Sequence, residues 1–398
     1  MLFMNATRQG LTPALVMLMS VATGLCVASN YYVQPLLNTI AQQFDLSVSL
    51  AGFIVTTAQL GYACGLLLLV PLGDRFERRS LIVTMILLAA TGTVIIALSH
   101  TFLFLLLGTV MTGLFSVAAQ ILVPLAATLA EPERRGKIVG TVMSGLLLGI
   151  LLARTVAGGL AQLGGWRTVY WTASLLMVIM ALALWRSLPR VKQSVPMSYP
   201  QLLASIFRLY AGNRVIRTRA WTGCLSFANF SLLWTSMAFL LSGAPYHFSE
   251  GKIGLLGLVG AAGALAARQA GSLADKGKAK LTTRLGLLLM LLSWAAIAWG
   301  AEQLVPLIVG ILLLDLAVQA VHITNQSVIY AQMPEARNRL NAGYMTSYFI
   351  GGAAGSLLSA TAYHLAGWYG VCIAGALLTL VNLLIWAGGS RFEPEKIN

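Results

Sequence analysis

The stretch VSLAGFIVTTAQLGYACGLLLLV at residues 48–70 is followed by GDRFERR at residues 73–79 and by SLIVTMILLAATGTVIIAL at residues 80–98. Each apolar stretch is as long as a bilayer-spanning helix, about 20 residues. Neither shows the two-residue alternation of a barrel strand, and lipid requires backbone polar groups to be satisfied within the segment. We therefore predict two membrane helices joined by a short charged loop.

The same pattern recurs along the whole chain. Of its 398 residues 58% are hydrophobic and 10% are charged, which is more apolar surface than a soluble core of that size buries. The predicted fold class is an all-α polytopic membrane protein with twelve transmembrane helices. Their predicted positions are 11–36, 48–70, 80–98, 102–129, 137–162, 167–186, 219–241, 252–273, 282–300, 304–330, 340–363 and 371–388.

Positive residues are concentrated in alternate loops, although the formal net charge is +14. The predicted outer loops hold only Arg167 and Lys252. The predicted inner segments hold Arg75, Arg78, Arg79, Arg134, Arg135, Lys137, the basic residues of 186–219 and 276–284, Arg337, Arg339 and the basic tail. This asymmetry is the positive-inside rule, so we predict a multi-pass protein of a bacterial inner membrane with both termini in the cytoplasm. The charge orients the chain in the bilayer, and we expect no nucleic-acid partner.

The first apolar run is too long for the core of a cleaved signal, and we predict that it is a retained helix. The four cysteines all fall inside predicted spans without CxxC spacing: Cys26, Cys64, Cys224 and Cys372. We therefore expect no disulfide, no metal site and no cofactor.

The chain divides near its middle, and its second half repeats its first. A shift of 202 residues superposes Pro132-Glu133-x-Arg135 on Pro334-Glu335-x-Arg337 and Gly165-Trp166 on Gly367-Trp368 without a gap. This indicates a parallel repeat of six helices, with the functional cavity between the halves. The predicted domains are an N-terminal bundle at 1–186, a cytoplasmic linker at 187–218 and a C-terminal bundle at 219–398.

Within the linker, a helical stripe is formed by Leu202, Leu203, Ile206, Phe207 and Tyr210. Such a stripe is typical of a short helix on the inner membrane surface. A simple solvated linker is an equal alternative.

The motif Gly73-Asp74-Arg75-Phe76-Glu77-Arg78-Arg79 resembles the signature of the major facilitator superfamily between its second and third helices. The pattern has glycine where this chain has Val70 and Glu77. A degenerate copy in the second half includes Asp275. The resemblance implies that Gly73, Asp74, Arg75, Arg78, Arg79 and Asp275 form a latch that holds the outward-facing state closed on the inside.

The fifth predicted span has small residues at the spacing that lets two helices approach closely, namely Gly145, Gly149, Ala153 and Gly158. It resembles the glycine-rich motif of superfamily antiporters, with Arg154 where the family has proline. The segments Tyr31-Tyr32-x-Gln34-Pro35-Leu36 and Asn325-Gln326 are similar to those of bacterial sugar and drug efflux permeases.

Asp315 is the only carboxylate that the predicted spans place deep in the membrane. A charge at mid-membrane costs about 2.5–3.5 kcal/mol on insertion scales, so this residue needs a partner or a function. Asp315, Gln319, His322 and Gln326 are spaced to form one stripe on the tenth helix, with Asn325 beside it. The stripe either packs the C-terminal half as a polar seam or lines a solvated substrate pathway.

Arg154 is the deepest predicted cation. It either pairs with Asp315 across the two halves or stays within its own bundle by bonding to backbone carbonyls or snorkelling. The resemblance implies that the first, fourth, seventh and tenth helices line the cavity. On this basis, further cavity candidates are Asn30, Tyr31, Tyr32, Gln34, Gln120, Asn229 and Trp234.

We predict a monomeric secondary transporter that exports a small organic molecule against proton entry. Asp315 is its predicted proton carrier, with His322 and Arg154 as further coupling candidates. An uncoupled facilitator or an uptake carrier of the same fold is the alternative. An intramembrane enzyme is disfavoured because the chain has no HExxH, GxSxG or Walker motif.

Overall fold

The computed structural model describes residues 11–131, 134–191, 197–266, 278–333 and 336–392, and these residues form helices and the turns between them. The first half contains α1 (Pro13–Ala28), η1 (Gln34–Leu36), α2 (Leu37–Gln43), α3 (Val48–Leu68), η2 (Val70–Asp74), α4 (Arg78–Leu98), α5 (Phe102–Phe115), η3 (Ser116–Ala118), α6 (Ala119–Leu129), α7 (Arg135–Gly164) and α8 (Trp166–Ser187). The remainder contains α9 (Tyr199–Gly212), α10 (Arg214–Ser242), α11 (Glu250–Ala266), α13 (Ala279–Trp299), α14 (Leu304–Gln332) and α15 (Arg337–Ser390).

Nine helices within the described ranges are long and apolar enough to cross a membrane. The shorter helices α1 and α11 add two passes. The 54-residue α15, counted once among the nine, makes two passes, because its backbone turns at Ala366 and Gly367. Gly367 has φ of +61°, which favours glycine, so the kink lies where a Cβ would be strained. The predicted all-α fold with twelve passes is confirmed.

Two passes differ from continuous helices. The predicted first span contains α1, a break after Ala28, the short η1 and α2. Pro35 lies in η1, where its fixed φ and missing N–H interrupt the regular helix. The fourth pass is α5 and α6 joined through η3, with Pro124 inside α6.

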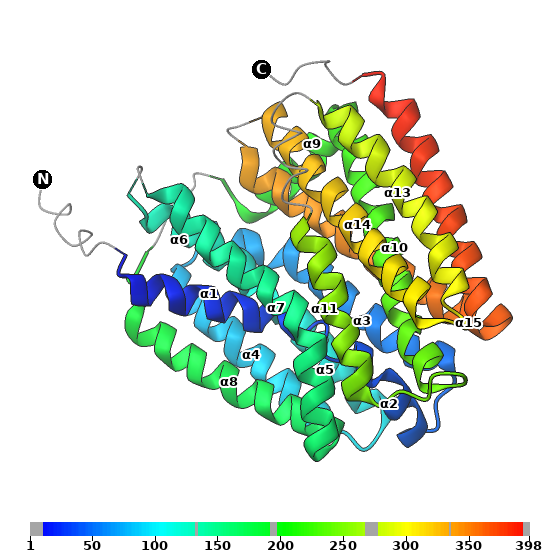
Figure 1. Ribbon diagram of the computed structural model, residues 1–398. Helices are drawn as coiled ribbons and strands as arrows, with labels where there is room; N and C mark the ends of the chain where they lie inside the picture. Colours follow the sequence, from blue (N-terminus) through cyan, green and yellow to red (C-terminus); the bar gives the residue numbers. More distant parts are fainter. Residues whose placement is uncertain (1–10, 132–133, 192–196, 267–277, 334–335, 393–398) are drawn as a thin grey trace, which may run out of the picture.

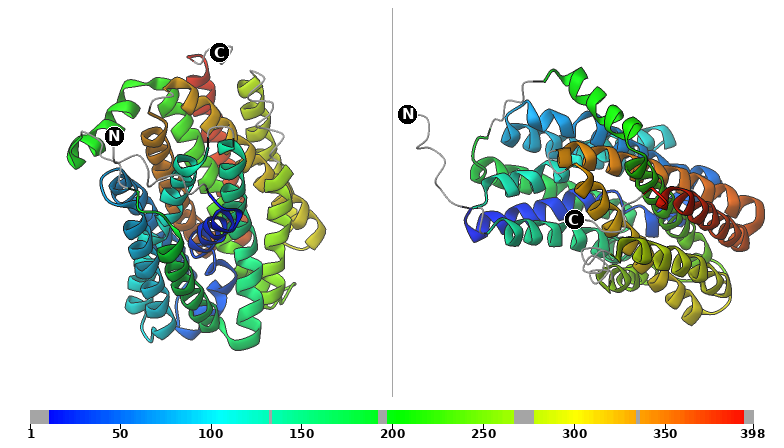
Figure 2. Two further views of the ribbon diagram at one scale, coloured as in Figure 1. Left: turned by 90° about the vertical axis from the view of Figure 1, so that its left-hand side faces the viewer. Right: turned by 90° about the horizontal axis from the view of Figure 1, so that it is seen from above.

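The helices form two six-helix bundles, α1 to α8 and α10 to α15. Figures 1 and 2 show the first bundle, coloured blue to green, beside the second, coloured green to red. Two helix pairs make the main contacts between them, α3 with α15 and α7 with α11. The short helices η1 and α2 add contacts with α10.

The two ends of this structure differ in charge. We call the end that carries α9 the basic end and the end that carries α2 the far end (Figure 1). Asp74 lines a pocket with Leu202 and Ile206 of α9, and Glu250 bonds to Thr39 of α2. The described chain starts and finishes at the basic end. Leu11 lines a groove with Arg186, and the Arg214 guanidinium lies 3.7 Å from the ring centroid of Phe392.

At the far end the two bundles are in close contact. A Cβ added to Gly158 on α7 would lie 2.3 Å from the carbonyl oxygen of Glu250 on α11. A Cβ added to Gly52 on α3 would lie 2.3 Å from the Cβ of Ala360 on α15. The Thr39 hydroxyl also donates to the Glu250 carboxylate. Small residues therefore allow the backbones to meet and close this end.

The linker helix α9 connects the two bundles at the basic end. It begins with a capping box made by Ser198 and Gln201. The Tyr199 hydroxyl donates to the Leu68 carbonyl of α3 over 2.6 Å, and the Tyr210 hydroxyl donates to the Leu340 carbonyl of α15 over 2.5 Å. A helix therefore forms where the sequence left a helix and a solvated linker as alternatives.

The predicted apolar stripe of α9 is partly buried and partly exposed. Leu202 and Ile206 are buried against the bundles, whereas the Phe207 side chain is 61% exposed. The stripe thus packs on protein at Leu202 and Ile206 and is exposed at Phe207.

Candidate substrate site between the two bundles

Arg154 lies in the middle of α7 and faces the second bundle. Its side chain is 2% exposed, and its Nε donates to Gln34 Oε1 over 2.6 Å. The guanidinium carbon lies 4.1 Å from the ring centroid of Trp234 and 5.1 Å from those of Tyr31 and Phe230. These rings stabilise the buried cation through their negative faces.

Close backbone packing places Arg154 at this interface. A Cβ added to Gly254 on α11 would lie 2.5 Å from the Arg154 carbonyl oxygen, and one added to Gly257 would lie 3.1 Å from the Arg154 Cβ. The Thr155 hydroxyl also donates to the Gly254 carbonyl over 2.9 Å. The position of Arg154 therefore depends on the absence of side chains on α11.

Asp315 lies in the middle of α14 and is 5% exposed. Its Oδ1 accepts a hydrogen bond from Trp234 Nε1 over 3.3 Å. A Cβ added to Gly260 on α11 would lie 2.1 Å from Asp315 Oδ2, so glycine is required there to leave room for the carboxylate. Asp315 is the only buried carboxylate among the residues that the structure describes.

Arg154 and Asp315, both within the described ranges, are not joined in an ion pair. Instead they share Trp234, which contacts the guanidinium with its ring and the carboxylate with its N–H. Their opposite charges attract across this gap. The predicted ion pair across the two halves is therefore not formed among the described residues, and Arg154 bonds instead within its own bundle, to the Gln34 side chain.

Aromatic rings continue from this pair toward α15. Phe230 stacks on Phe227 at 5.3 Å between centroids, and Phe227 stacks on Tyr348 at 4.1 Å. The ring centroids of Phe349 on α15 and Tyr62 on α3 are 4.2 Å apart, so this contact crosses the interface between the bundles. The centre of the interface therefore combines one cation, one carboxylate and several aromatic faces.

The residues of the polar stripe on α14 have different partners along the helix. His322 Nδ1 lies 3.1 Å from the Tyr344 hydroxyl, and Gln326 Nε2 lies 4.0 Å from the Met345 sulfur. Gln319 is half-buried. Asn325 accepts from Arg219 Nη1 over 3.0 Å, within the second bundle. Asp315 therefore faces the charged centre, while His322 and Gln326 contact α15 and Asn325 contacts α10.

Four of the other predicted cavity residues have different surroundings, and two of them point into their own bundle. The Asn30 amide donates to Ser116 Oγ inside the first bundle over 3.0 Å, and Tyr32 lines a groove between α1, α7 and α8. Asn229 accepts from Trp294 Nε1 over 2.9 Å inside the second bundle. Gln120 donates to the Tyr62 hydroxyl over 3.2 Å near the interface.

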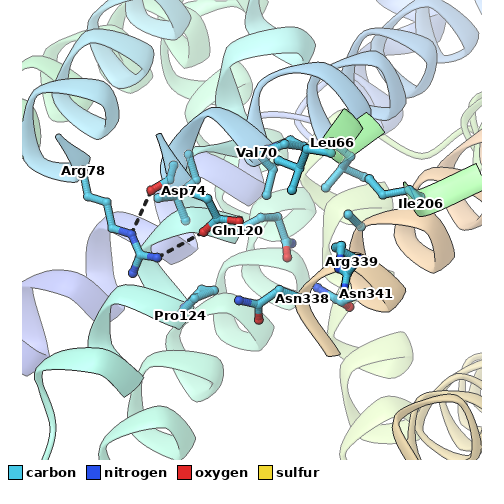
Figure 3. Close-up of a pocket in the computed structure, with 15 residues that line it drawn as sticks. Leu66, Val70, Asp74, Arg78, Gln120, Pro124, Ile206, Asn338, Arg339 and Asn341 are labelled. Carbon is cyan, nitrogen blue, oxygen red and sulfur yellow. Dashed lines mark hydrogen bonds and ion pairs between the residues drawn. The ribbon is translucent and has the colours of Figure 1, made fainter. Parts of the chain in front are cut away.

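A pocket lies between the bundles at the basic end (Figure 3). Asp74 and Gln120 face Asn338, Arg339 and Asn341 across it (Figure 3). Ile206 of α9 closes one side (Figure 3). The interface is thus in contact at the far end and separated by a pocket at the basic end.

The predicted latch residues lie beside this pocket. Arg78 Nη2 contacts Asp74 Oδ1 at 3.3 Å, and Arg78 Nε donates to the Gly73 carbonyl over 3.0 Å (Figure 3). Arg79 donates to the Leu188 carbonyl over 3.3 Å, and Arg75 is exposed. These contacts lie within the first bundle. The predicted partner Asp275 in the second half lies outside the described residues.

Glu77, which occupies a glycine position of the signature, caps α4. Its carboxylate accepts from the backbone N–H groups of Arg79 and Ser80 over 2.8 and 2.9 Å, and also from the Ser80 hydroxyl. Partial burial opposes ionisation, but these hydrogen bonds and the nearby Arg79 outweigh it and lower the pKa of the Glu77 carboxyl below its usual value. The departure from glycine therefore supplies a helix cap.

The small residues of α7 contact two different partners. A Cβ added to Gly145 or Gly149 would lie 2.2 Å from a backbone oxygen of α1, that of Ser20 or Gly24. Gly158 packs on α11 of the other bundle, and Ala153 is buried. The motif therefore fixes α1 on α7 and also closes the far end.

Sequence reasoning missed two buried features. Gly260 belongs to a series of glycines three residues apart, with Gly254, Gly257 and Gly263, and this spacing is the signal that could have found it. Arg219 is fully buried and donates to Thr283 Oγ1 over 2.7 Å. It was grouped with the basic linker because it stands at the first residue of the predicted seventh span.

The fold and the charged centre between two similar bundles define a class, that of secondary transporters working by alternating access. The family profile of the Major Facilitator Superfamily matches residues 19–313 and 220–397. The chain belongs to this superfamily, and it is a multi-pass membrane transporter and not an enzyme.

Similar proteins span nearly the whole chain. It is 67% identical over 386 residues to the "Uncharacterized transporter YgaY" of Escherichia coli O157:H7, covering 97% of this chain and 98% of that protein. It is 26% identical over 363 residues to the "Inner membrane transport protein YnfM" of Escherichia coli K12, covering 89% and 85%. A crystal structure of a bacterial homologue of the human lysosomal transporter Spinster shares the fold, with a TM-score of 0.80 at 17% identity over 97% of this chain and 99% of that chain.

Proposed function

We propose that the protein exports a small organic solute in exchange for protons, and that Asp315 is the residue that carries the proton. The observation that supports this most directly is the isolation of Asp315, the only buried carboxylate in the described part of the chain. The orientation proposed from the charge distribution makes the basic end cytoplasmic. The structure then corresponds to a state closed to the outside.

The surroundings of Asp315 suit a group that gains and loses a proton. The charged or titratable groups near it are Arg154 on α7 and Tyr348 on α15, and Trp234 on α10 donates its hydrogen bond. Burial favours the neutral acid, whereas the cation and the N–H favour the carboxylate. Rearrangement of the bundles changes the balance between these effects, because Arg154 and Asp315 belong to different bundles.

Export rather than uptake is supported by the resemblance of α7 to the glycine-rich motif of antiporters, and its packing is consistent with a helix that couples two interfaces. Its glycines at 145 and 149 contact α1, and Gly158 contacts α11, as a helix that couples two interfaces requires. His322 lies further along α14 than Asp315, against Tyr344 of α15, and acts in this scheme as a hydrogen-bonding neighbour of the aromatic cluster.

Asp315→Asn tests the proposal in inverted membrane vesicles with an acidic interior. A solute first selected by its binding to the purified protein should accumulate in vesicles with the native chain and release protons to the outside. The variant should still exchange labelled solute down its gradient but should not concentrate it, because asparagine cannot titrate. Glu302→Gln is the matched control, since Glu302 is exposed at the far end. Concentration by the Asp315 variant with an unchanged pH dependence would contradict the proposal.

A further inference from the structure

We infer that the solute is dipolar, with an anionic oxygen group that binds Arg154 and Gln34 and a cationic nitrogen that binds Asp315. This inference rests on the proposed function, because it places the solute where Asp315 exchanges its proton. It adds the chemical class of the solute. The argument starts from the hydrogen-bonding groups that the described residues leave unused at this site.

Two buried donors at the first bundle lack an acceptor among the described residues. They are Arg154 Nη2 and Gln34 Nε2. Gln34 Oε1 already accepts from Arg154 Nε over 2.6 Å, so the two free donors belong to one hydrogen-bonded pair. A guanidinium binds carboxylate oxygens in a planar fork, and an amide N–H₂ adds a further donor. The ligand group that complements this pair is an anionic oxygen group.

The second bundle offers the opposite chemistry. An ionised carboxylate only accepts hydrogen bonds, and among the described residues Asp315 receives one, from Trp234 at Oδ1. Oδ2 lies close to α11, where a Cβ added to Gly260 would be 2.1 Å away. A proton or a cationic nitrogen satisfies this oxygen. When the nitrogen of the solute binds it, the proton leaves, and this competition produces exchange.

The aromatic rings beside these charges complement the body of the solute. Trp234 contacts both charged groups, and Phe230 and Tyr31 surround the guanidinium. Such faces bind apolar or aromatic groups and also favour a cation placed over them. The site therefore complements a compact zwitterion with an apolar or aromatic side group.

Solutes with a single charge fit this arrangement less well. A plain anion at Arg154 would remove the positive charge that favours ionised Asp315, so it would bind together with a proton instead of exchanging for one. A plain cation at Asp315 would leave the donors of Arg154 and Gln34 unused and would be repelled by the guanidinium. A dipolar solute avoids both conflicts.

The test uses matched forms of two amino acids as probes of the purified protein. L-phenylalanine and L-leucine are compared with their methyl esters, which are cations, with their N-acetyl derivatives, which are anions, and with their neutral N-acetyl methyl esters. Calorimetry should show that a zwitterion binds about tenfold more tightly than each of its three derivatives. Equal or tighter binding by any singly charged or neutral form overturns the inference, as does the absence of binding by all eight compounds.

Two variants assign each charge to its partner. In Arg154→Gln the ester should bind about as well as the zwitterion, because the carboxylate no longer gains from the guanidinium. In Asp315→Asn the N-acetyl form should bind about as well as the zwitterion. Arg154→Lys keeps the charge without the fork and should retain part of the preference. The melting temperature of each variant without ligand shows whether it is folded, and unchanged selectivity in both neutral variants overturns the inference.

The two proposals fail separately. If the zwitterions bind selectively but Asp315→Asn vesicles still concentrate the solute, the proton coupling is wrong and the solute class stands. If proton exchange depends on Asp315 but the singly charged compounds bind best, the solute class is wrong and the coupling stands.

Discussion

The far end and the basic end of the interface are held differently. At the far end, Gly52 and Gly158 let backbones touch, and the hydroxyl groups of Thr56 and Ser356 lie 2.7 Å apart across α3 and α15. At the basic end a pocket lined with Asp74 and Arg339 lies between the bundles. The closed end therefore depends on small side chains, whereas the open end carries charge.

This difference indicates how the two ends can alternate. Contacts between small residues gain dispersion energy only at short range, so a slight separation of the helices loses them. Charged and polar groups at the basic end interact over longer distances and are solvated while apart. Closing one end and opening the other thus exchanges close packing for charge and hydrogen-bond contacts. The charged centre at Arg154 and Asp315 lies between these ends.

The largest expected effect concerns which end faces the cytoplasm. In a background without the native cysteines, Gly212→Cys at the basic end should resist an impermeant thiol reagent in intact spheroplasts and react in inverted vesicles. Gly212 has open space around it, so the substitution should not disturb packing. Leu163→Cys at the far end, where Leu163 is 87% exposed, should show the opposite pattern. Labelling of residue 212 from outside would reverse the proposed topology.

The next effect is on closure of the far end. Gly158→Leu places a side chain where a Cβ already lies 2.3 Å from the Glu250 carbonyl, so we expect α7 and α11 to remain apart and transport to fall about tenfold or more. Gly159→Leu is the matched control, because no atom lies within 4 Å of an added Cβ there. Spin labels at Leu163 and Lys252 should report a longer distance in the first variant only. An unchanged distance with normal transport would show that this contact is not needed.

A smaller effect is expected at the basic end. Asp74→Asn removes the charge that contacts Arg78 at 3.3 Å, while Arg78 keeps its hydrogen bond to the Gly73 carbonyl. We expect slower transport with solute affinity within about threefold of the native value, since Asp74 lies away from the charged centre. Glu131→Gln, an exposed carboxylate at the same end, is the control. Loss of binding by a folded Asp74 variant would place this residue in the solute site.

Much of the fold follows from the sequence because the length of an apolar run is a one-dimensional signal. A deep charge such as Asp315 or Arg154 is equally visible, since it interrupts such a run. The rotation of each helix against its neighbours depends on packing between distant segments. For this reason the sequence did not show that Asn229 points into its own bundle toward Trp294, or that Asp315 and Arg154 approach the same indole of Trp234.

The site also requires glycine at position 260, because a larger side chain would collide with Asp315. A sequence pattern does not show which glycines are needed for this reason. Gly260 contributes only the space beside Asp315 Oδ2. Arg219 shows a different limit. A single basic residue at a predicted helix boundary belongs equally well to the loop or to the helix, and only the packing of α10 decides between them.

The smallest predicted effect is on the cap that starts α4 beside the basic-end pocket. Glu77→Gln keeps an acceptor but removes the charge that accepts from the N–H groups of Arg79 and Ser80, and we expect a loss of about 1 kcal/mol in stability at pH 7. The pKa of Glu77 is lowered in the folded protein, so its contribution is present above the ordinary carboxyl pKa and is lost as pH falls through the lowered value. Melting temperatures of the purified native and variant proteins should therefore differ at about pH 7 and converge below about pH 4. A difference that persists unchanged in acid would mean that the shape of the side chain, rather than its charge, supports the cap.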